Sequence, residues 1–557
     1  MAVAVQVRQR RRSRDAQAAL RAAWGQPKSR DRDLPLIANY HHARVRPAGA
    51  SVALDARTWA DLDLDAVFSF LDRTESVPGR QVLYHRLRST VHSPGSLADF
   101  DELVERLGRE AAFRLRAQRV LAPLDGALFH WLWALALEPV EPLPRWAIVY
   151  PLFAGLMVLC LCLSPLLPPL LLVPVFGFVG GGALRATLGL RLVPIANSFR
   201  DMVRLLVAAG RLADFEEVPE GVRRELTARL VAVAGLRRWG GLLGRGAEAN
   251  LDLVGVFLEY LNLLFCLDAN AVMLGVRELR RHQDDLHAVF EAVGALDAAL
   301  AIASVRASGI AWTRPVFDAP RSPVVLEALR HPLIDRPVPN SLTLGPPDGL
   351  LVTGANMTGK STFLRTVGVN AVLAQSLHTV FAGSYRAPWL EVASCITAGD
   401  SLLAGKSSYQ AEVETLVGML SRLTDGRGGD RLFLFDELFR GTNTLDRIGA
   451  ASAVLWWLVG HEGPKVGGSE GPKVGGSRCL VIAATHDLEL VALLAGRFEA
   501  GHFADRLGES GLQFDYVLRP GPTTTRNAIA LLGVLGAPPE VVNDALARTE
   551  VLRARRG

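Results

Sequence analysis

Charged residues are missing from one long internal stretch of this 557-residue chain. Arg145 and Arg185 bracket the stretch, and residues 146–184 between them include no Asp, Glu, Lys or Arg. A helix needs about 20 apolar residues to cross a bilayer, so two short membrane-spanning helices have room here. The prolines within 164–169 predict a turn at the middle. We therefore expect a helical hairpin with legs at 146–163 and 167–184. A re-entrant hairpin or a tilted pair is one alternative, and a pair of helices buried in a large core is another.

Cysteine is scarce, with five in the whole chain. Two lie in the apolar stretch, and none of the five has the spacing of a metal site: they are Cys160, Cys162, Cys266, Cys395 and Cys479. We therefore expect no zinc site and no disulfide.

Acidic residues are scarce near the start. The first 46 residues contain eleven Lys and Arg but only three Asp, although the net charge of the chain is just +5. A basic arm of this kind can bind nucleic acid or anionic lipid, and a solvated tail is the alternative.

The most specific motif present is Gly354-Ala355-Asn356-Met357-Thr358-Gly359-Lys360-Ser361, which has the pattern of a phosphate-binding loop. An apolar strand is expected at 349–353 and a helix from Ser361 onward. Lys360 would then contact the β- and γ-phosphates, and Ser361 would give its hydroxyl to Mg²⁺. A chance glycine turn is the alternative, which the flanking strand and helix disfavour.

A carboxylate pair, Asp436 and Glu437, follows the apolar run 432–435. Such a run is typical of a parallel strand buried on both faces. We expect Asp436 to hold Mg²⁺ through water and Glu437 to polarise the attacking water. A surface carboxylate pair at a strand end is the alternative.

Two further motifs are expected to contact the γ-phosphate. His486 follows a second apolar strand at 478–484, where it would sense the γ-phosphate. Ser407 and Ser408 precede a predicted helix, whose N-terminus would offer N–H donors to an anion. In a head-to-tail ABC-type dimer, that anion is the γ-phosphate bound by the other subunit; a plain capped helix is the alternative.

Together these motifs resemble the MutS family of DNA mismatch-repair ATPases over roughly 325–550. Residues 353–362 are close to the family's T-G-P-N-M-G-G-K-S-T, and 436–446 to its D-E-[IL]-G-R-G-T-[SA]-T-x-D. Residues 485–490 resemble T-H-[YF]-x-E-L, and 405–412 resemble G-[RK]-S-[TS]-F-x-x-E. His331-Pro332-Leu333 and residues 516–541 follow family patterns at the two ends of the domain.

The resemblance implies ATP and Mg²⁺ as cofactors and a homodimer with composite ATP sites. It implies that Asp446 lies near the dimer interface and that Glu437 and His486 are the catalytic residues. Ser361 and Asp436 would hold the metal. The nucleotide contacts it implies are Gly354, Asn356, Met357, Thr358, Gly359, Lys360, Ser361, Thr362, Ser407 and Ser408.

Upstream, residues 55–62, 70–74 and 79–80 resemble the start of the family's helical core, and 195–312 are helical by pattern. The run 251–274 predicts a packed helix. Because the core-like region begins near residue 50, we expect no mismatch-reading or connector domain before it. We also expect no nuclease domain after the ATPase.

The predicted fold is multidomain, α plus α/β. A helical MutS-type core and lever region carries the apolar hairpin and is followed by an ABC-type P-loop ATPase domain. The predicted boundaries are a basic arm at 1–48, helical core at 49–145, hairpin at 146–184, core and lever at 185–318, and ATPase at 319–557. An eight-residue repeat makes 461–478 a flexible loop by composition.

Three functions follow from these features. The first is a MutS-like, DNA-binding ATPase tethered to the cell membrane by the hairpin, with double-stranded or branched DNA as its partner. The second is a membrane-associated ATPase or scaffold without mismatch recognition, and the third, less favoured, is a transporter. Basic residues flanking the hairpin predict a cytoplasmic ATPase domain. Charge alone assigns DNA contacts to Arg237, Arg238, Arg277, Arg280 and Arg281, and a solvated face is the alternative.

Overall fold

The chain forms two compact units in the computed structural model. Unit 1 comprises Met1–Ser51, Leu71–Arg86 and Ala98–Ser308, and unit 2 comprises Val52–Phe70, Leu87–Leu97 and Gly309–Gly557. The structure describes residues 18–45, 54–89, 94–140, 145–188, 193–238, 260–355, 357–396, 408–423, 429–460, 478–508, 511–523 and 536–556. The first half of the predicted basic arm, Asn356, Ser407 and the duplicated segment 461–477 therefore lie outside the described residues.

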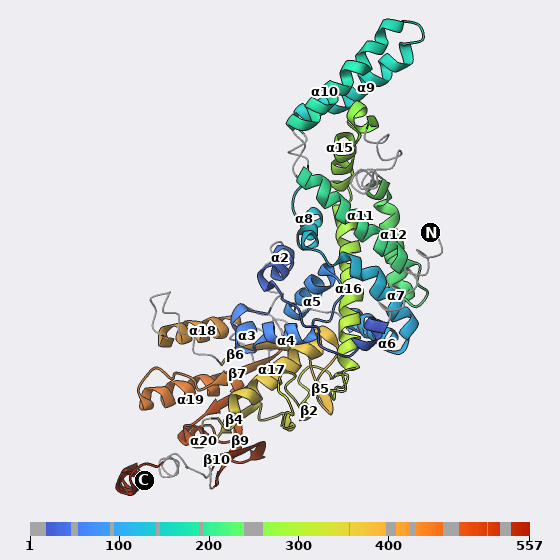
Figure 1. The fold of residues 1–557 in the computed structure, drawn as a ribbon. Coiled ribbons are helices and arrows are strands. Elements are labelled where there is room, and N and C mark those ends of the chain that lie inside the picture. Colours follow the sequence, from blue (N-terminus) through green and yellow to red (C-terminus); the bar gives the residue numbers. More distant parts are fainter. Residues whose placement is uncertain are drawn as a thin grey trace, which may run out of the picture. The chain divides into compact units, whose positions relative to one another are not determined.

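Unit 1 is helical and is organised around the long helix α16 (Gln283–Arg306), most of which is buried (Figure 1). Helices α8, α11 and α12 pack against α16. The predicted helix at 251–274 is interrupted, because Cys266 adopts a left-handed conformation (φ 46°) between a helical segment at 260–265 and α15. The other helices that lie wholly or mostly in this unit are α2 (Leu34–Val45), α5 (Val77–Arg88), α6 (Pro94–Arg109), α7 (Ala111–Leu121), α8 (Leu132–Leu137), α11 (Val193–Ala213), α12 (Glu220–Ala232) and α15 (Leu267–Leu279), with 3₁₀ turns at Ala122–Leu124 and Ala127–Trp131.

A buried carboxylate ties two of these helices together. Asp297, in the middle of α16, accepts hydrogen bonds from the backbone N–H groups of Glu75 (2.8 Å) and Ser76 (2.7 Å) at the start of α5. Burial raises the pKa of Asp297 to about 6, although these donors favour the charged form. The start of α5 is therefore fixed by a single anionic side chain.

The second half of the basic arm differs from the prediction of a free arm. Arg30 and Arg32 both bind the buried carboxylate of Asp72, at 2.5 and 2.8 Å. Lys28 pairs with Glu75 at 2.6 Å and also donates to the carbonyl of Thr74. These cations are satisfied inside unit 1, so they are not available to nucleic acid or lipid.

The apolar stretch forms two helices joined by a short turn (Figure 1). A 3₁₀ turn at Arg145–Ile148 leads into α9 (Val149–Leu163), and a second 3₁₀ turn at Pro168–Leu171 leads into α10 (Leu172–Leu188). Two of the described helical segments are long and apolar enough to cross a membrane, Arg145–Leu163 and α16. Only 22% of the first is buried, against 78% of the second, so α16 is a core helix and α9 is exposed.

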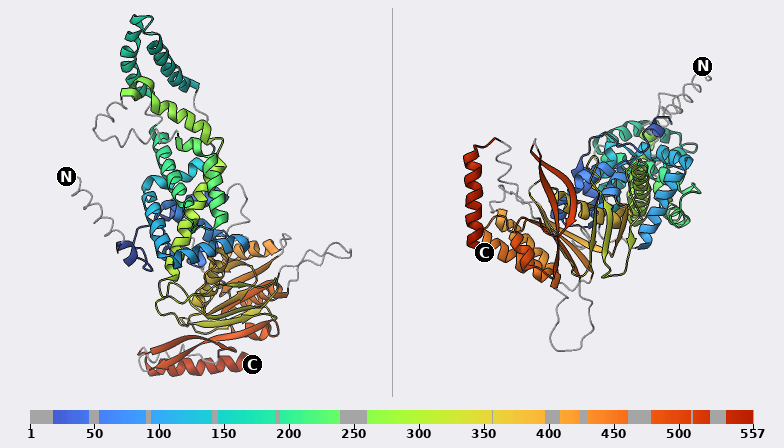
Figure 2. Two further views of the ribbon diagram at one scale, coloured as in Figure 1. Left: turned by 90° about the vertical axis from the view of Figure 1, so that its right-hand side faces the viewer. Right: turned by 90° about the horizontal axis from the view of Figure 1, so that it is seen from below.

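Unit 2 contains a six-stranded sheet with the order β10-β9-β4-β8-β7-β6. Its strands are β4 (Gly349–Thr353), β6 (Leu390–Cys395), β7 (Asp430–Asp436), β8 (Cys479–Thr485), β9 (Phe498–Gly508) and β10 (Gly511–Pro520). All neighbours pair in parallel except β10, which runs antiparallel to β9 at the edge; Figure 2 shows these two long strands in red. A second sheet, of order β1-β5-β2-β3, is formed by Val316–Phe317, Ser384–Ala387, Val324–Leu329 and Asn340–Leu344.

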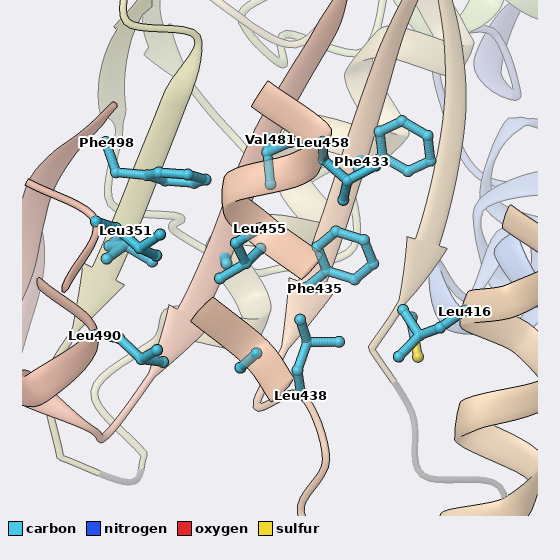
Figure 3. Packing of buried hydrophobic residues seen from close by; sticks show 14 of the residues in the cluster. Leu351, Leu416, Phe433, Phe435, Leu438, Leu455, Leu458, Val481, Leu490 and Phe498 are labelled. Atoms are coloured by element: carbon cyan, nitrogen blue, oxygen red, sulfur yellow. The ribbon is translucent and has the colours of Figure 1, made fainter. Parts of the chain in front are cut away.

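Helices cover both faces of the six-stranded sheet. Figure 3 shows Leu455 and Leu458 pointing from α19 (Thr444–Gly460) toward Phe433 and Phe435 of β7. Helix α18 (Ser408–Leu423) adds Leu416 to the same cluster, and α20 (Leu488–Leu493) extends it. Helix α17 (Lys360–Leu377) packs on β6, β7 and β8 with its side chains almost all buried. The last helix is α22 (Pro539–Arg556).

Part of the stretch predicted as the start of the helical core belongs to unit 2 in the structure. Helix α3 (Ala56–Asp61) and most of α4 (Leu64–Leu71) belong to unit 2. Asp61 accepts bonds from the Ser394 hydroxyl (2.9 Å) and the Ile396 N–H (2.8 Å) at the end of β6. Arg57 donates to Thr415 on α18 (2.6 Å) and to the Cys395 sulfur (3.0 Å). Polar bonds over more than 300 residues of chain therefore attach this segment to the sheet.

Candidate nucleotide-binding site

Three parallel strands deliver the predicted site residues to one edge of the sheet. The register pairs Thr353 of β4 with Thr485 of β8, and Asp436 of β7 with Ala484 of β8. The carboxyl ends of β4, β7 and β8 are therefore level. Ligands of open α/β sheets bind at this end of the strands.

The phosphate loop follows β4 and begins α17 at Lys360. Gly354 and Gly359 have φ values of +143° and +106°, which side chains with a Cβ rarely adopt. Thr358 closes the loop by donating its hydroxyl to the carbonyl of Ala355 (2.8 Å). Met357 is exposed, and so is Thr362, although Lys360 and Phe363 beside it in the first turn of α17 are buried. The geometry directs the N-terminus of α17 toward the loop, as phosphate binding requires.

Lys360 crosses back over this loop. Its ammonium donates to the carbonyls of Gly354 (2.8 Å) and Ala355 (2.9 Å), and it lies 3.2 Å from the His486 ring nitrogen Nε2. Burial lowers the pKa of Lys360, while Glu437 and Asp436 act in the opposite direction. The site thus holds a desolvated cation, which attracts anions more strongly than a hydrated one.

The residues expected to hold the metal are in contact. Ser361 donates its hydroxyl to Asp436 Oδ2 at 2.5 Å. The second oxygen of Asp436, Oδ1, is buried and has no hydrogen-bond partner among the described residues. Burial raises the pKa of Asp436, partly offset by the Ser361 bond. A hydroxyl beside a carboxylate with a spare buried oxygen is a donor set that fits Mg²⁺.

Glu437 lies next to this pair in a left-handed backbone conformation (φ 53°). Its Oε1 is 2.6 Å from His486 Nε2, and its Oε2 accepts from Arg440 Nε at 2.6 Å. Burial alone would raise the pKa of Glu437, but the bonds from His486 and Arg440 outweigh it and lower the pKa to about 2. A cavity of about 80 Å³ beside Glu437 and His486 has room for water but not for a nucleotide.

Helix α18 is connected to the acidic pair through a residue to which the motifs gave no role. Glu412 accepts a bond from the N–H of Phe439 at 2.5 Å, two residues beyond Glu437. Burial raises the pKa of Glu412, partly offset by this bond. The side chain of Ser408, at the start of α18, is outside the described residues, so its predicted contact with a second subunit stays a prediction.

Asp446 lies in the first turn of α19, where it is exposed. Its N–H donates to the side chain of Asn443 at 2.9 Å, so Asn443 caps the helix. The role of Asp446 at the dimer interface stays a prediction.

A second cavity, of about 330 Å³, opens beside the phosphate loop and was missed by the motif reasoning. Its lining includes Gly359 and Thr362 of the loop region, Ile334, Val338 and the ring of Tyr516. Tyr516 has φ 56° at a bulge in β10, and Asn340 holds this bulge by bonding the Tyr516 carbonyl (3.0 Å) and the Leu518 N–H (2.7 Å). An apolar pocket with an aromatic ring beside a phosphate loop suits a nucleobase.

His331 also lines this pocket. Burial lowers its pKa to about 4, with Arg365 acting in the same direction, so the ring is neutral at physiological pH. The sequence signals for the pocket were the His331-Pro332-Leu333 motif and Tyr516, both noted as family patterns but given no role.

The structure thus brings together five of the predicted residues: Lys360, Ser361, Asp436, Glu437 and His486. The ends of strands β7 and β8 and the start of helix α17 supply them. No group of three or more His, Cys, Asp or Glu suited to a metal ion occurs in the described part of the chain, and none of the five cysteines, all of which lie in that part, is in a disulfide.

Comparison with known proteins gives one family model and many relatives. Residues 350–553 match the model for MutS domain V. The DNA mismatch repair protein MutS of Thermus thermophilus is 34% identical over 290 residues, covering 51% of this chain and 33% of that protein. MutS of Thermus caldophilus is 29% identical over 535 residues, covering 88% of this chain and 61% of that protein.

A further relative is DNA mismatch repair protein MutS 2 of Halobacterium salinarum, 31% identical over 284 residues, or 49% of this chain and 30% of that protein. The chain spans about a third of the length of the first relative and under two thirds of the Thermus caldophilus protein. Together with the site, these similarities support a relationship to the MutS family that is carried most clearly by the ATPase domain.

Proposed function

We propose that this chain is a MutS-like, Mg²⁺-dependent ATPase that works as a homodimer on DNA and is tethered to the cell membrane with its ATPase domain in the cytoplasm. The observation that carries the ATPase proposal is the convergence of Lys360, Ser361, Asp436, Glu437 and His486 at one edge of the sheet. They come from three separate motifs, and each lies within hydrogen-bond distance of at least one other, which chance placement would not produce.

The hydrogen bonds in the structure indicate which contacts each side chain exchanges when ATP and Mg²⁺ bind. Lys360 exchanges the carbonyls of Gly354 and Ala355 for the phosphates of ATP, which are stronger partners for an ammonium. Ser361 and Asp436 hold Mg²⁺, which neutralises charge on the phosphates. The pocket lined by Ile334, Val338 and Tyr516 receives the base.

Glu437 orients the attacking water. With both carboxylate oxygens bound and a pKa of about 2, it is a weak base in this conformation. At least one of its bonds to His486 or Arg440 must therefore break before it can accept a proton. Dimer closure is the event that would do this, since the second subunit would bring its own Ser407 and Ser408 to the γ-phosphate.

The dimer proposal predicts that Glu437→Ala retains ATP binding but traps a closed dimer. Size-exclusion chromatography with and without ATP measures this directly. A Glu437→Ala protein that stays monomeric in saturating ATP, or hydrolyses ATP at the normal rate, would contradict the assigned role.

DNA binding is supported by the placement of the arginines chosen from charge. Gly235, just before Arg237 and Arg238, lies against the side chain of Glu278, which is flanked by Arg277 and Arg280. The two groups therefore share one surface of unit 1, and all five arginines are exposed. Arg281 is only loosely paired, at 3.9 Å from Glu278.

If these arginines contact phosphates, affinity for duplex or branched DNA falls steeply with salt. Five contacts give a slope of about −4.5 in log K against log salt concentration. The triple change of Arg277, Arg280 and Arg281 to alanine should reduce that slope by about 2 to 3, whereas Arg109→Ala, an exposed arginine of α6, should not. An unchanged slope would remove this surface from the DNA site.

A second function stays open: a membrane-associated ATPase or scaffold without mismatch recognition. The exposed apolar helices α9 and α10 favour it, because DNA binding has no need of them. Equal affinity for paired, mismatched and branched DNA, together with DNA-independent ATP turnover, would favour this alternative over the first.

A further inference from the structure

The turn that joins α9 to α10 leaves none of its backbone N–H groups without a partner. Of the seven residues Ser164 to Leu170, three are prolines and have no N–H to satisfy. The remaining four N–H groups are all bonded within the hairpin, each at 3.0 Å. Ser164 donates to the carbonyl of Cys160, Leu166 and Leu167 both donate to that of Leu163, and Leu170 donates to that of Leu167.

The single polar side chain of the turn is also satisfied. Ser164 donates its hydroxyl to the carbonyl of Leu161 at 2.8 Å. Irregular backbone does not occur in contact with lipid when its polar groups lack partners, because each would cost several kcal/mol. Here the donors of the turn need nothing from water.

The outward surface of the same turn is apolar. Leu166 is 79% exposed and Leu167 is 57% exposed, and the legs continue this surface through Leu159 and Val175. The two legs pack closely, since a Cβ added to Gly177 of α10 would lie 2.4 Å from the sulfur of Met157 on α9. The hairpin is thus a packed pair whose tip, unlike a turn that faces water, presents no charged group.

The length of the hairpin matches this environment. Arg145–Leu163 has 19 residues, so the first leg is about 28 Å long. The hydrocarbon core is about 30 Å thick, and helices tilt by about 20° on average. A tilted hairpin that enters from one side therefore ends before the far headgroups.

We propose that the hairpin enters the bilayer from one side and that its turn at 164–170 stays inside the hydrocarbon without reaching the water beyond. This inference rests on the proposed membrane tether and specifies its topology as a one-sided anchor. The ATPase unit and both ends of the hairpin then share one aqueous compartment.

Vesicles of phosphatidylcholine and phosphatidylglycerol test this with the full-length chain. The unsubstituted protein should float with the vesicles. Leu156→Lys should weaken partitioning about 100-fold, because Leu156 is an exposed residue in the middle of α9 and a lysine there would lie near the bilayer centre. Val231→Lys should leave it unchanged, because Val231 is an exposed apolar residue of α12, outside the hairpin.

Labelling of Leu166→Cys places the turn. A membrane-impermeant maleimide, added outside or trapped inside the vesicles, should give no labelling above that of the unsubstituted chain until detergent is added. Labelling by the trapped reagent would mean that the turn emerges on the far side, and labelling from outside that the hairpin lies on the surface. Either result would overturn the inference while leaving the tether intact, whereas failure of the unsubstituted protein to float would overturn the tether itself.

Discussion

Replacing Glu437 by glutamine tests how tightly the resting site holds this carboxylate. His486 and Arg440 each contact one of its oxygens at 2.6 Å and lower its pKa from 4.5 to about 2. One pKa unit corresponds to about 1.4 kcal/mol, and the side chain is 16% exposed, so solvent screening reduces the total to about 2 kcal/mol. Glu437→Gln keeps the shape and removes the charge. It should therefore lower the unfolding free energy of unit 2 by about that amount at pH 7.

The direction of the Glu437 pKa shift determines how the stability effect changes with pH. A folded pKa below the unfolded value means that the ionised carboxylate stabilises the folded state. The stabilisation is complete above about pH 4.5 and is lost as the pH falls toward 2. The difference between the original protein and Glu437→Gln should therefore shrink progressively below pH 4.5.

Urea unfolding at several pH values measures the effect, with hydrogen exchange of the β7 and β8 amides assigning it to unit 2. Asp544→Asn is the control, because Asp544 pairs with Arg548 on the exposed surface of α22 and should contribute well under 1 kcal/mol. A Glu437→Gln protein that is equally stable at pH 7, or equally destabilised at pH 7 and pH 3, would refute the assigned ion-pair network.

Three further predictions concern other parts of the molecule. Asp297→Ala should cost about 3 kcal/mol in unit 1 by leaving two buried N–H groups unpaired. The original protein should lose stability as the pH rises from about 4 to 6, because the folded pKa of Asp297 is raised to about 6, and Asp297→Ala should abolish this loss. Urea unfolding monitored by exchange of the α5 amides measures both the cost and the pH dependence. Arg57→Ala should release α18 from α3 and so slow ATP turnover without changing ATP affinity, which steady-state kinetics would measure. Arg386→Ala, which removes an exposed surface ion pair with Asp318, should leave turnover unchanged. Tyr516→Ala should weaken ATP binding about tenfold while Tyr516→Phe does not, measured by calorimetry; equal effects of the two changes would exclude ring stacking.

The parts that sequence predicted well are those fixed by local pattern. The strands at β4, β7 and β8 were expected because continuous apolar runs mark parallel strands buried on both faces. The start of α17 was expected because glycines at 354 and 359 permit a loop that no other residue type closes. The motif order predicted that Lys360, the acidic pair and His486 share one site, and the structure brings these side chains together, while the roles assigned to them stay predictions.

The parts that sequence missed depend on long-range contacts. Nothing local in Thr58 or Asp61 indicates that they bond Ser394 more than 300 residues later, so α3 was assigned to the helical core. The charge of Arg30 and Arg32 was visible, but their shared partner Asp72 was not. Charge composition alone does not distinguish a free arm from an internally paired one.

The most direct test of the central claim is the Mg²⁺-dependent ATP hydrolysis rate of the purified full-length chain, compared with its Lys360→Ala and Arg386→Ala variants, with and without duplex DNA. We predict turnover that requires Mg²⁺, falls about 10²-fold to 10³-fold in Lys360→Ala, stays nearly intact in Arg386→Ala, and responds to DNA less as salt is raised. Turnover in Lys360→Ala equal to that of the original protein would contradict the account, because the site built around this side chain would not be the one that hydrolyses ATP.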